Sequence, residues 1–154
     1  MIRETVVFAL CIAGCYAIRG CFKEDNDADR ITISSSTPVA IRYEGGRSPC
    51  SVIVEAADKS KKLGFTIKQV VTRALFQGDH YFSVVSYNDP TKLYAPLAKY
   101  QYTGYDYDEQ ARHNPQSVNG APFKTTTDGA YLLLSYESDR NSGYRVFDMD
   151  VWQE

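Results

Sequence analysis

The sequence lacks an excess of charge of either sign. Its 154 residues contain 17 Lys and Arg against 19 Asp and Glu, a formal net charge of −2. A nucleic-acid interface needs a basic surface, so this balance argues against a nucleic-acid partner. Apolar residues make up 44% of the chain, which argues against disorder. The length suits one domain with one hydrophobic core.

Residues that carry catalysis are also scarce. The chain has two histidines, His80 and His113, and neither has a second histidine or cysteine at metal-ligand spacing. No serine lies in a Gly-x-Ser-x-Gly motif, and no glycine-rich phosphate loop occurs. We therefore expect a binding protein rather than an enzyme, with a hydrolase whose site is unrecognised as an alternative.

The chain has no apolar run long enough for a transmembrane helix. Residues 6–18 are apolar over about 13 positions, short of the ~20 that a membrane span needs. Polar residues flank this run, which is the layout of a secretory signal peptide over residues 1–20. Residues 21–154 are then a single secreted, extracellular domain. Two alternatives remain: a buried first strand or helix, and a bacterial lipoprotein signal with Cys15 lipidated.

Cysteine is limited to four residues. Cys11 and Cys15 lie in the predicted signal peptide, which leaves Cys21 and Cys50 in the secreted domain. Two cysteines in such a domain permit one internal disulfide. On the loop-entropy model this bridge would stabilise the domain by ~3–4 kcal/mol.

Most of the remaining sequence alternates between apolar and polar residues over short runs separated by turn residues. No convincing amphipathic helix is present, so the pattern predicts an all-β fold, an antiparallel β-sandwich of jelly-roll type. Strands are expected at 31–33, 39–43, 50–56, 63–71, 80–87 and 123–126. Residues 92–102 predict a short strand or a helical turn, and residues 104–121 a long loop.

The last quarter of the chain has the strongest strand pattern. Residues 130–136 and 144–152 flank a polar loop and predict an antiparallel pair of strands in the core. Each run has one apolar face, formed by Leu132, Leu134 and Tyr136 in the first and by Phe147, Met149 and Val151 in the second. Tyr144 and Val146 alternate in the opposite phase to the apolar residues that follow them, which predicts a β-bulge near Val146.

Several of these segments together resemble a CUB domain, an extracellular β-sandwich of secreted proteins. The family's first disulfide matches Cys21 and Cys50, and the apolar alternation after its cysteine matches residues 50–54. The family pattern includes an aspartate followed by a strand and a turn, and residues 79–89 match it. The family ends with a strand that leads to Ser-Asp and then to Gly and an aromatic residue, and residues 132–144 match this ending. The resemblance implies a secreted binding domain that recognises a protein or a glycan.

The chain departs from the CUB pattern in two respects. The family's second disulfide is missing, and no acidic residue lies in residues 59–78, where many members have a calcium-binding glutamate. The resemblance implies calcium ligation by Asp79 and Asp139, but two carboxylates would bind calcium weakly. In the alternative interpretation, these aspartates shape turns and no cofactor is bound.

Residues 100–109 contain four tyrosines and three acidic residues. Tyrosine is enriched at binding surfaces, and acidic residues favour a basic partner. The predicted partner-binding residues are Tyr105, Asp106, Tyr107, Asp108 and Glu109. Sulfation of Tyr105 or Tyr107 is one alternative, and a solvated insert is another. Tyr100 and Tyr102 are expected to pack on a sheet.

The sequence as a whole thus predicts a secreted CUB-like binding domain. The first alternative is a bacterial surface lipoprotein with an adhesin or carbohydrate-binding sandwich. Neither interpretation identifies the ligand or the oligomeric state.

Overall fold

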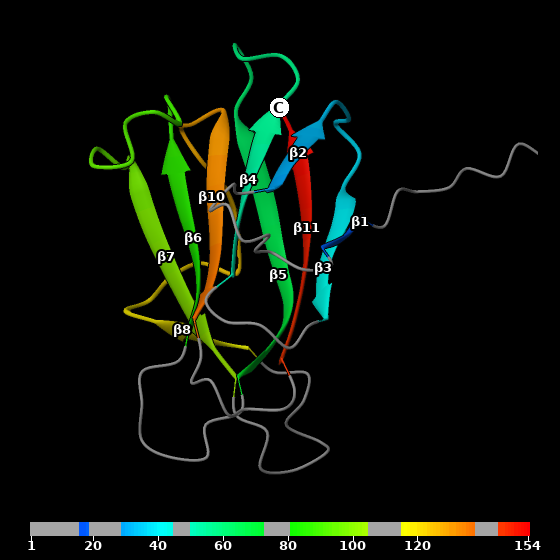
Figure 1. Cartoon of the computed structure of the whole chain (residues 1–154), viewed down its shortest axis with the longest axis vertical. Helices are drawn as coiled ribbons and strands as arrows, with labels where there is room; N and C mark the ends of the chain where they lie inside the picture. Colours follow the sequence, from blue (N-terminus) through cyan, green and yellow to red (C-terminus); the bar gives the residue numbers. More distant parts are fainter. Residues whose placement is uncertain (1–15, 19–28, 45–49, 73–80, 105–114, 138–144) are drawn as a thin grey trace, which may run out of the picture.

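The protein is a sandwich of two β-sheets (Figure 1). The structure, a computed structural model, describes residues 16–18, 29–44, 50–72, 81–104, 115–137 and 145–154. Within these ranges every regular element is a strand and no helix occurs. The predicted all-β sandwich is therefore confirmed. No helix in the described part of the chain is long and apolar enough to cross a membrane.

Each sheet has a central strand from the last quarter of the chain. Sheet A consists, in spatial order, of β1 (Tyr16–Ile18), β3 (Val39–Glu44), β11 (Arg145–Gln153), β5 (Leu63–Thr72) and β9 (Lys124–Thr126). Sheet B consists of β2 (Asp29–Ile33), β4 (Cys50–Ala56), β10 (Tyr131–Glu137), β6 (Tyr81–Tyr87), β7 (Ala98–Thr103) and β8 (Gln116–Val118). Neighbouring strands are antiparallel, except that β1 pairs with β3, and β2 with β4, in parallel.

The expected pairing of the last two strands is wrong. β10 pairs with β4 and β6 in sheet B, whereas β11 pairs with β3 and β5 in sheet A. Their apolar faces meet across the core, where the rings of Tyr136 and Phe147 lie 6.4 Å apart. Two strands that each have one apolar face can bury those faces as neighbours in one sheet or opposite each other in two packed sheets. The sequence pattern is the same in both cases, so it could not distinguish them.

The predicted apolar faces themselves are confirmed. Leu132, Leu134 and Tyr136 of β10 are at most 1% exposed, as are Phe147, Met149 and Val151 of β11. These side chains join an aromatic cluster that connects the two sheets. Phe82 of β6 stacks on Phe147 with ring centroids 4.4 Å apart, and Tyr43 of β3 stacks on Phe147 at 5.5 Å. The central strands therefore form the middle of one continuous core.

The β-bulge does not lie near Val146. Asp148 of β11 is opposite Gln69 of β5, but Met149 is opposite Ile67, so Lys68 is the extra residue. This bulge explains why the buried residues Ile67 and Val70 are three positions apart instead of two. The Lys68 ammonium lies 2.5 Å from the Asp150 carboxylate on the outer face of sheet A.

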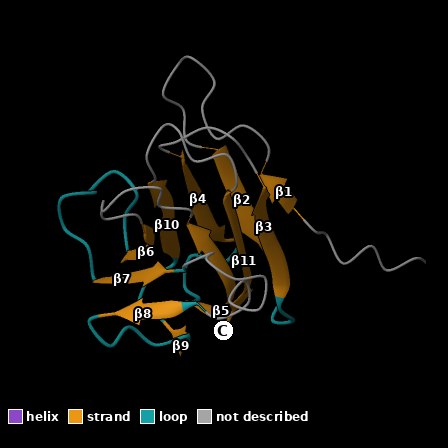
Figure 2. Cartoon of the chain, turned by 90° about the horizontal axis from the view of Figure 1, so that it is seen from below, coloured by secondary structure: helices purple, strands orange, loops and turns teal. Residues whose placement is uncertain are grey.

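Two edge strands were not expected. β8 lies within the segment that was predicted to be a loop, and Tyr16–Ile18 forms β1 although it belongs to the predicted signal peptide. Cleavage after residue 20 would remove β1, and the signal peptide stays a prediction. Figure 2 shows β8 and β9 on one side of the molecule, with β1 on the other side.

One tryptophan covers the outer face of sheet A. Trp152 lies directly over Gly64 of β5, where a side chain would collide with the indole ring. The indole Nε1 donates a hydrogen bond of 2.7 Å to Glu154 Oε1, and the Lys124 ammonium lies 5.7 Å from the ring centroid. The hydrogen bonds from Trp152 and Thr126 lower the pKa of Glu154. Gly64 thus provides the room that lets Trp152 lie flat on the sheet.

Candidate functional site

The candidate site lies beside β7, at the edge of sheet B. β7 pairs with β6 along residues 98–102, but β8 covers only residues 101–103 on its other side. A tight turn follows β8, in which Ala121 N–H donates to the Val118 carbonyl at 3.3 Å. Asn119 and Gly120 both have positive φ, 56° and 72°, as a type I′ turn requires. The Asn-Gly dipeptide suits this turn because both residues tolerate that backbone conformation.

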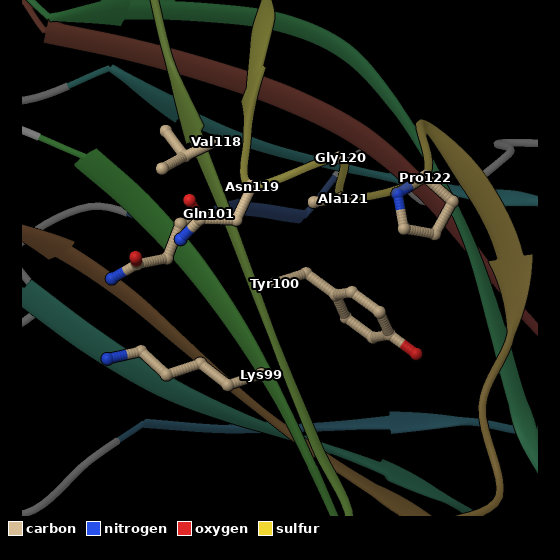
Figure 3. A pocket seen from close by; sticks show the side chains of 8 residues that line it. All are labelled: Lys99, Tyr100, Gln101, Val118, Asn119, Gly120, Ala121 and Pro122. Atoms are coloured by element: carbon tan, nitrogen blue, oxygen red, sulfur yellow. The ribbon is translucent and has the colours of Figure 1, made fainter.

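The turn and β7 enclose a shallow hollow of about 210 Å³ (Figure 3). It is lined by Lys99, Tyr100, Gln101, Val118, Asn119, Gly120, Ala121 and Pro122. Pockets for drug-sized molecules are typically ~300–1,000 Å³, so this one is smaller. Its size suits one sugar ring or one side chain of a protein partner.

Three side chains give the hollow its hydrogen-bonding capacity. Figure 3 shows Lys99 and Gln101 pointing to the same side of β7, because they are two residues apart on one strand. Asn119 adds a second amide from the turn. Within the described part of the chain, none of these three side chains has an ion pair or hydrogen-bond partner. An ammonium and two amides can together bind a carboxylate and neighbouring hydroxyl groups.

Tyr100 points to the other side of β7 from Lys99 and Gln101 (Figure 3), and aromatic packing fixes its position. The Tyr100 ring packs against Phe65 of β5 at a centroid distance of 5.5 Å, and Tyr102 is fully buried against Phe82 and Phe123. The expectation that Tyr100 and Tyr102 pack on a sheet is confirmed. The Tyr102 hydroxyl donates a hydrogen bond to the carbonyl of the lining residue Pro122. Burial, with a smaller contribution from Tyr100, raises the pKa of the Tyr102 hydroxyl.

The predicted partner-binding residues Tyr105, Asp106, Tyr107, Asp108 and Glu109 lie outside the described residues. They belong to the segment that connects β7 to β8, which are the two strands that flank the hollow. Their role in binding therefore stays a prediction, and the hollow adds described residues on the same hairpin. Sequence reasoning missed Lys99, Gln101 and Asn119, although the Asn-Gly dipeptide could have indicated a tight turn.

The predicted calcium ligands Asp79 and Asp139 also lie outside the described residues. β6 begins two residues after Asp79 and β10 ends two residues before Asp139, and the register pairs Tyr81 with Glu137. Calcium binding stays a prediction. In the six described ranges, no group of three or more His, Cys, Asp or Glu side chains could hold a metal ion.

Cys50 is the part of the predicted disulfide that the structure describes. It is buried at the start of β4. Cys21 lies outside the described residues, so the pairing of Cys21 with Cys50 stays a prediction.

Comparison with models of known protein families finds no match, and comparison with curated proteins finds none either.

Proposed function

We propose that this chain is a secreted, CUB-like recognition domain that binds an extracellular protein or glycan through the β7–β8 hairpin. The observation that carries the proposal is the hollow beside β7, where Lys99, Gln101 and Asn119 present hydrogen-bonding groups without partners in the described chain. The strand β7 holds two of these groups, and a tight turn holds the third. Recognition by polar groups on a rigid sandwich is the role that this arrangement supports.

The chemistry of the hollow favours an acidic group on the partner. Lys99 would donate to a carboxylate or sulfate, and the two amides would bind hydroxyl or amide groups beside it. The hollow is large enough for one residue of the partner only, so the rest of the affinity must come from surrounding contacts. The predicted tyrosine loop extends from the same hairpin and is the proposed source of those contacts.

The binding test uses an array of sialylated, sulfated and neutral glycans together with an array of extracellular protein domains. The test variant carries Lys99→Thr, Gln101→Val and Asn119→Gly, which remove the ammonium and the two amides and keep the strand and the positive φ. We expect acidic probes to bind wild type about tenfold or more tightly than this variant, since charge-assisted hydrogen bonds are lost. Lys61→Thr, on the exposed β4–β5 turn, is the matched control.

Equal binding by wild type and the triple variant would refute the role of the hollow, provided both unfold at the same temperature. Binding by neutral probes alone would refute the preference for an acidic group. Weaker binding by the Lys61→Thr control would show that general surface charge, not the hollow, is responsible.

Secretion is tested separately by the intact mass of the mature protein before and after reduction. The proposal expects a chain that begins near Cys21 and gains two hydrogens on reduction. A diacylated Cys15 would instead support the surface lipoprotein, and a full-length chain with reduced thiols would contradict secretion. Added mass in units of one sulfate would support sulfation of Tyr105 or Tyr107.

A further inference from the structure

The loop between β6 and β7 exposes three large apolar side chains. Leu93, Tyr94 and Leu97 are 49%, 83% and 44% exposed, and we call them the apolar tip. Figure 1 shows this loop at the same end of the sandwich as the C-terminus, whereas β8 lies toward the other end. A group of exposed apolar side chains can mark a site of interaction with a protein or a membrane.

Hydrogen bonds hold this loop in one conformation. Asp89 Oδ1 accepts from the backbone N–H and the hydroxyl of Thr91, at 2.9 and 2.7 Å. These bonds lower the pKa of the Asp89 carboxyl, which keeps it ionised and able to accept them. Two backbone bonds follow, from Lys92 N–H to the Asp89 carbonyl at 3.1 Å and from Ala95 N–H to the Lys92 carbonyl at 2.9 Å.

Two further bonds attach the loop to β6. The Tyr87 hydroxyl donates to the Leu93 carbonyl at 3.2 Å, and Leu97 N–H donates to the Ser86 carbonyl at 2.8 Å. Both bonds use the backbone of the tip residues and leave their side chains outward. The exposure of the apolar tip is therefore a property of a fixed loop conformation.

Basic residues stand at both ends of the apolar tip. Lys92 directly precedes it and Lys99 lies two residues after it, while residues 93–98 carry no charge. The single acid in residues 88–99 is Asp89, whose carboxylate lies 3.6 Å from the Lys92 ammonium. A lysine beside an uncharged Leu, Tyr and Leu group fits a lipid bilayer, where phosphates lie above the acyl chains.

We propose that the β6–β7 loop docks this domain onto an anionic lipid bilayer. Leu93 and Leu97 enter the boundary between head groups and acyl chains, and Tyr94 keeps its ring there with its hydroxyl at the polar level. Lys92 then contacts lipid phosphates, which adds electrostatic attraction. A protein partner is less favoured because the tip is a small exposed group of only three apolar side chains.

The docking test measures cosedimentation of the full secreted protein with two kinds of vesicle. One kind is phosphatidylcholine alone, and the other contains about one-third phosphatidylserine to supply negative surface charge. The test variant is Leu93→Ser with Tyr94→Ser, which removes apolar surface and leaves the backbone bonds of the loop available. Lys61→Ser, which removes an exposed lysine from the β4–β5 turn at the same end, is the control.

We expect wild type and the control to bind the phosphatidylserine vesicles and the double variant to bind about tenfold or more weakly. A Tyr94→Trp variant should show a blue shift of its fluorescence on these vesicles, above the constant signal of the buried Trp152. Because Leu93 and Tyr94 do not line the hollow beside β7, failure of this test leaves the proposed function intact.

Three outcomes would overturn the proposal. The first is equal vesicle binding by wild type and the double variant when both have the same unfolding temperature. The second is no blue shift of the Tyr94→Trp fluorescence on vesicles that bind the protein. The third is a wild type that ignores vesicles and dimerises through the tip, seen as dimerisation that the double variant lacks.

Discussion

Replacing Gly64 with alanine would place a methyl group against the indole ring of Trp152. The new Cβ would lie 2.3 Å from Cε2, 2.5 Å from Cζ2 and 2.6 Å from Nε1 of that ring. All three distances are far below van der Waals contact, so the ring must move. Trp152 would then lose its hydrogen bond to Glu154 and its position beside the Lys124 ammonium.

The expected cost is about 2 kcal/mol, the middle of the range for forcing an extra methyl group into a packed site. The gain from the lower unfolded-state entropy of alanine, about 0.4–1 kcal/mol, offsets only part of the collision. Urea unfolding followed by circular dichroism measures the change. The slope of the unfolding free energy with urea concentration should stay constant, because the same surface is exposed in both proteins.

A double-mutant cycle with Trp152→Ala identifies the cause. If the collision with the indole ring is responsible, Gly64→Ala should cost little once the ring is absent, and the coupling should be about 2 kcal/mol. Additive costs would refute this reasoning. Gly120→Ala is a useful contrast: its φ is +72° and nothing lies within 4 Å, so backbone strain alone should cost about 1–2 kcal/mol, whether or not Trp152 is present.

Three further predictions concern the core, the buried tyrosine and the surface. Leu134→Ala should cost about 3 kcal/mol in urea unfolding because Leu134 is buried, whereas Leu133→Ala on the outer face should cost clearly less. Because the pKa of Tyr102 is raised, the folded protein keeps a proton that the unfolded chain loses above about pH 10, so stability should fall as pH rises beyond that value. Tyr102→Phe should flatten this fall, and an unchanged slope would contradict it. Lys62→Gln, which removes the exposed ion pair with Asp128 at 2.8 Å, should leave the urea midpoint unchanged in high salt.

Alternation predicted strands well wherever one face is buried. The expected strand at residues 50–56 has the bounds of β4, and its alternate residues are buried as predicted. The same reasoning identified the inward faces of β10 and β11. In each case the pattern of a single strand was sufficient, because burial of alternate residues depends on that strand and the core beneath it.

Pairing could not be predicted in the same way. The choice between a β10–β11 hairpin and two opposed central strands depends on partners that are distant in sequence, namely β4, β6, β3 and β5. The parallel pairing of β2 with β4 has no local signature either. Register and neighbours follow from the complete core, which one segment does not contain.

The candidate site was hidden for a related reason. β8 is three residues long and has no alternating apolar pattern, so its strand conformation depends on pairing with β7. In the sequence, Lys99 and Gln101 look like ordinary polar residues of a strand. They line a hollow only because the Asn119–Gly120 turn comes back toward β7.

Backbone amide chemical-shift mapping tests the proposed recognition surface most directly. The ¹⁵N-labelled domain would be titrated with the acidic glycan or protein domain that gives the strongest array signal. We expect the largest shifts at residues 99–101 and 118–121, with loss of those shifts in the Lys99→Thr, Gln101→Val, Asn119→Gly variant. Shifts confined to the outer face of sheet A, around Trp152, would contradict recognition through the β7–β8 hairpin.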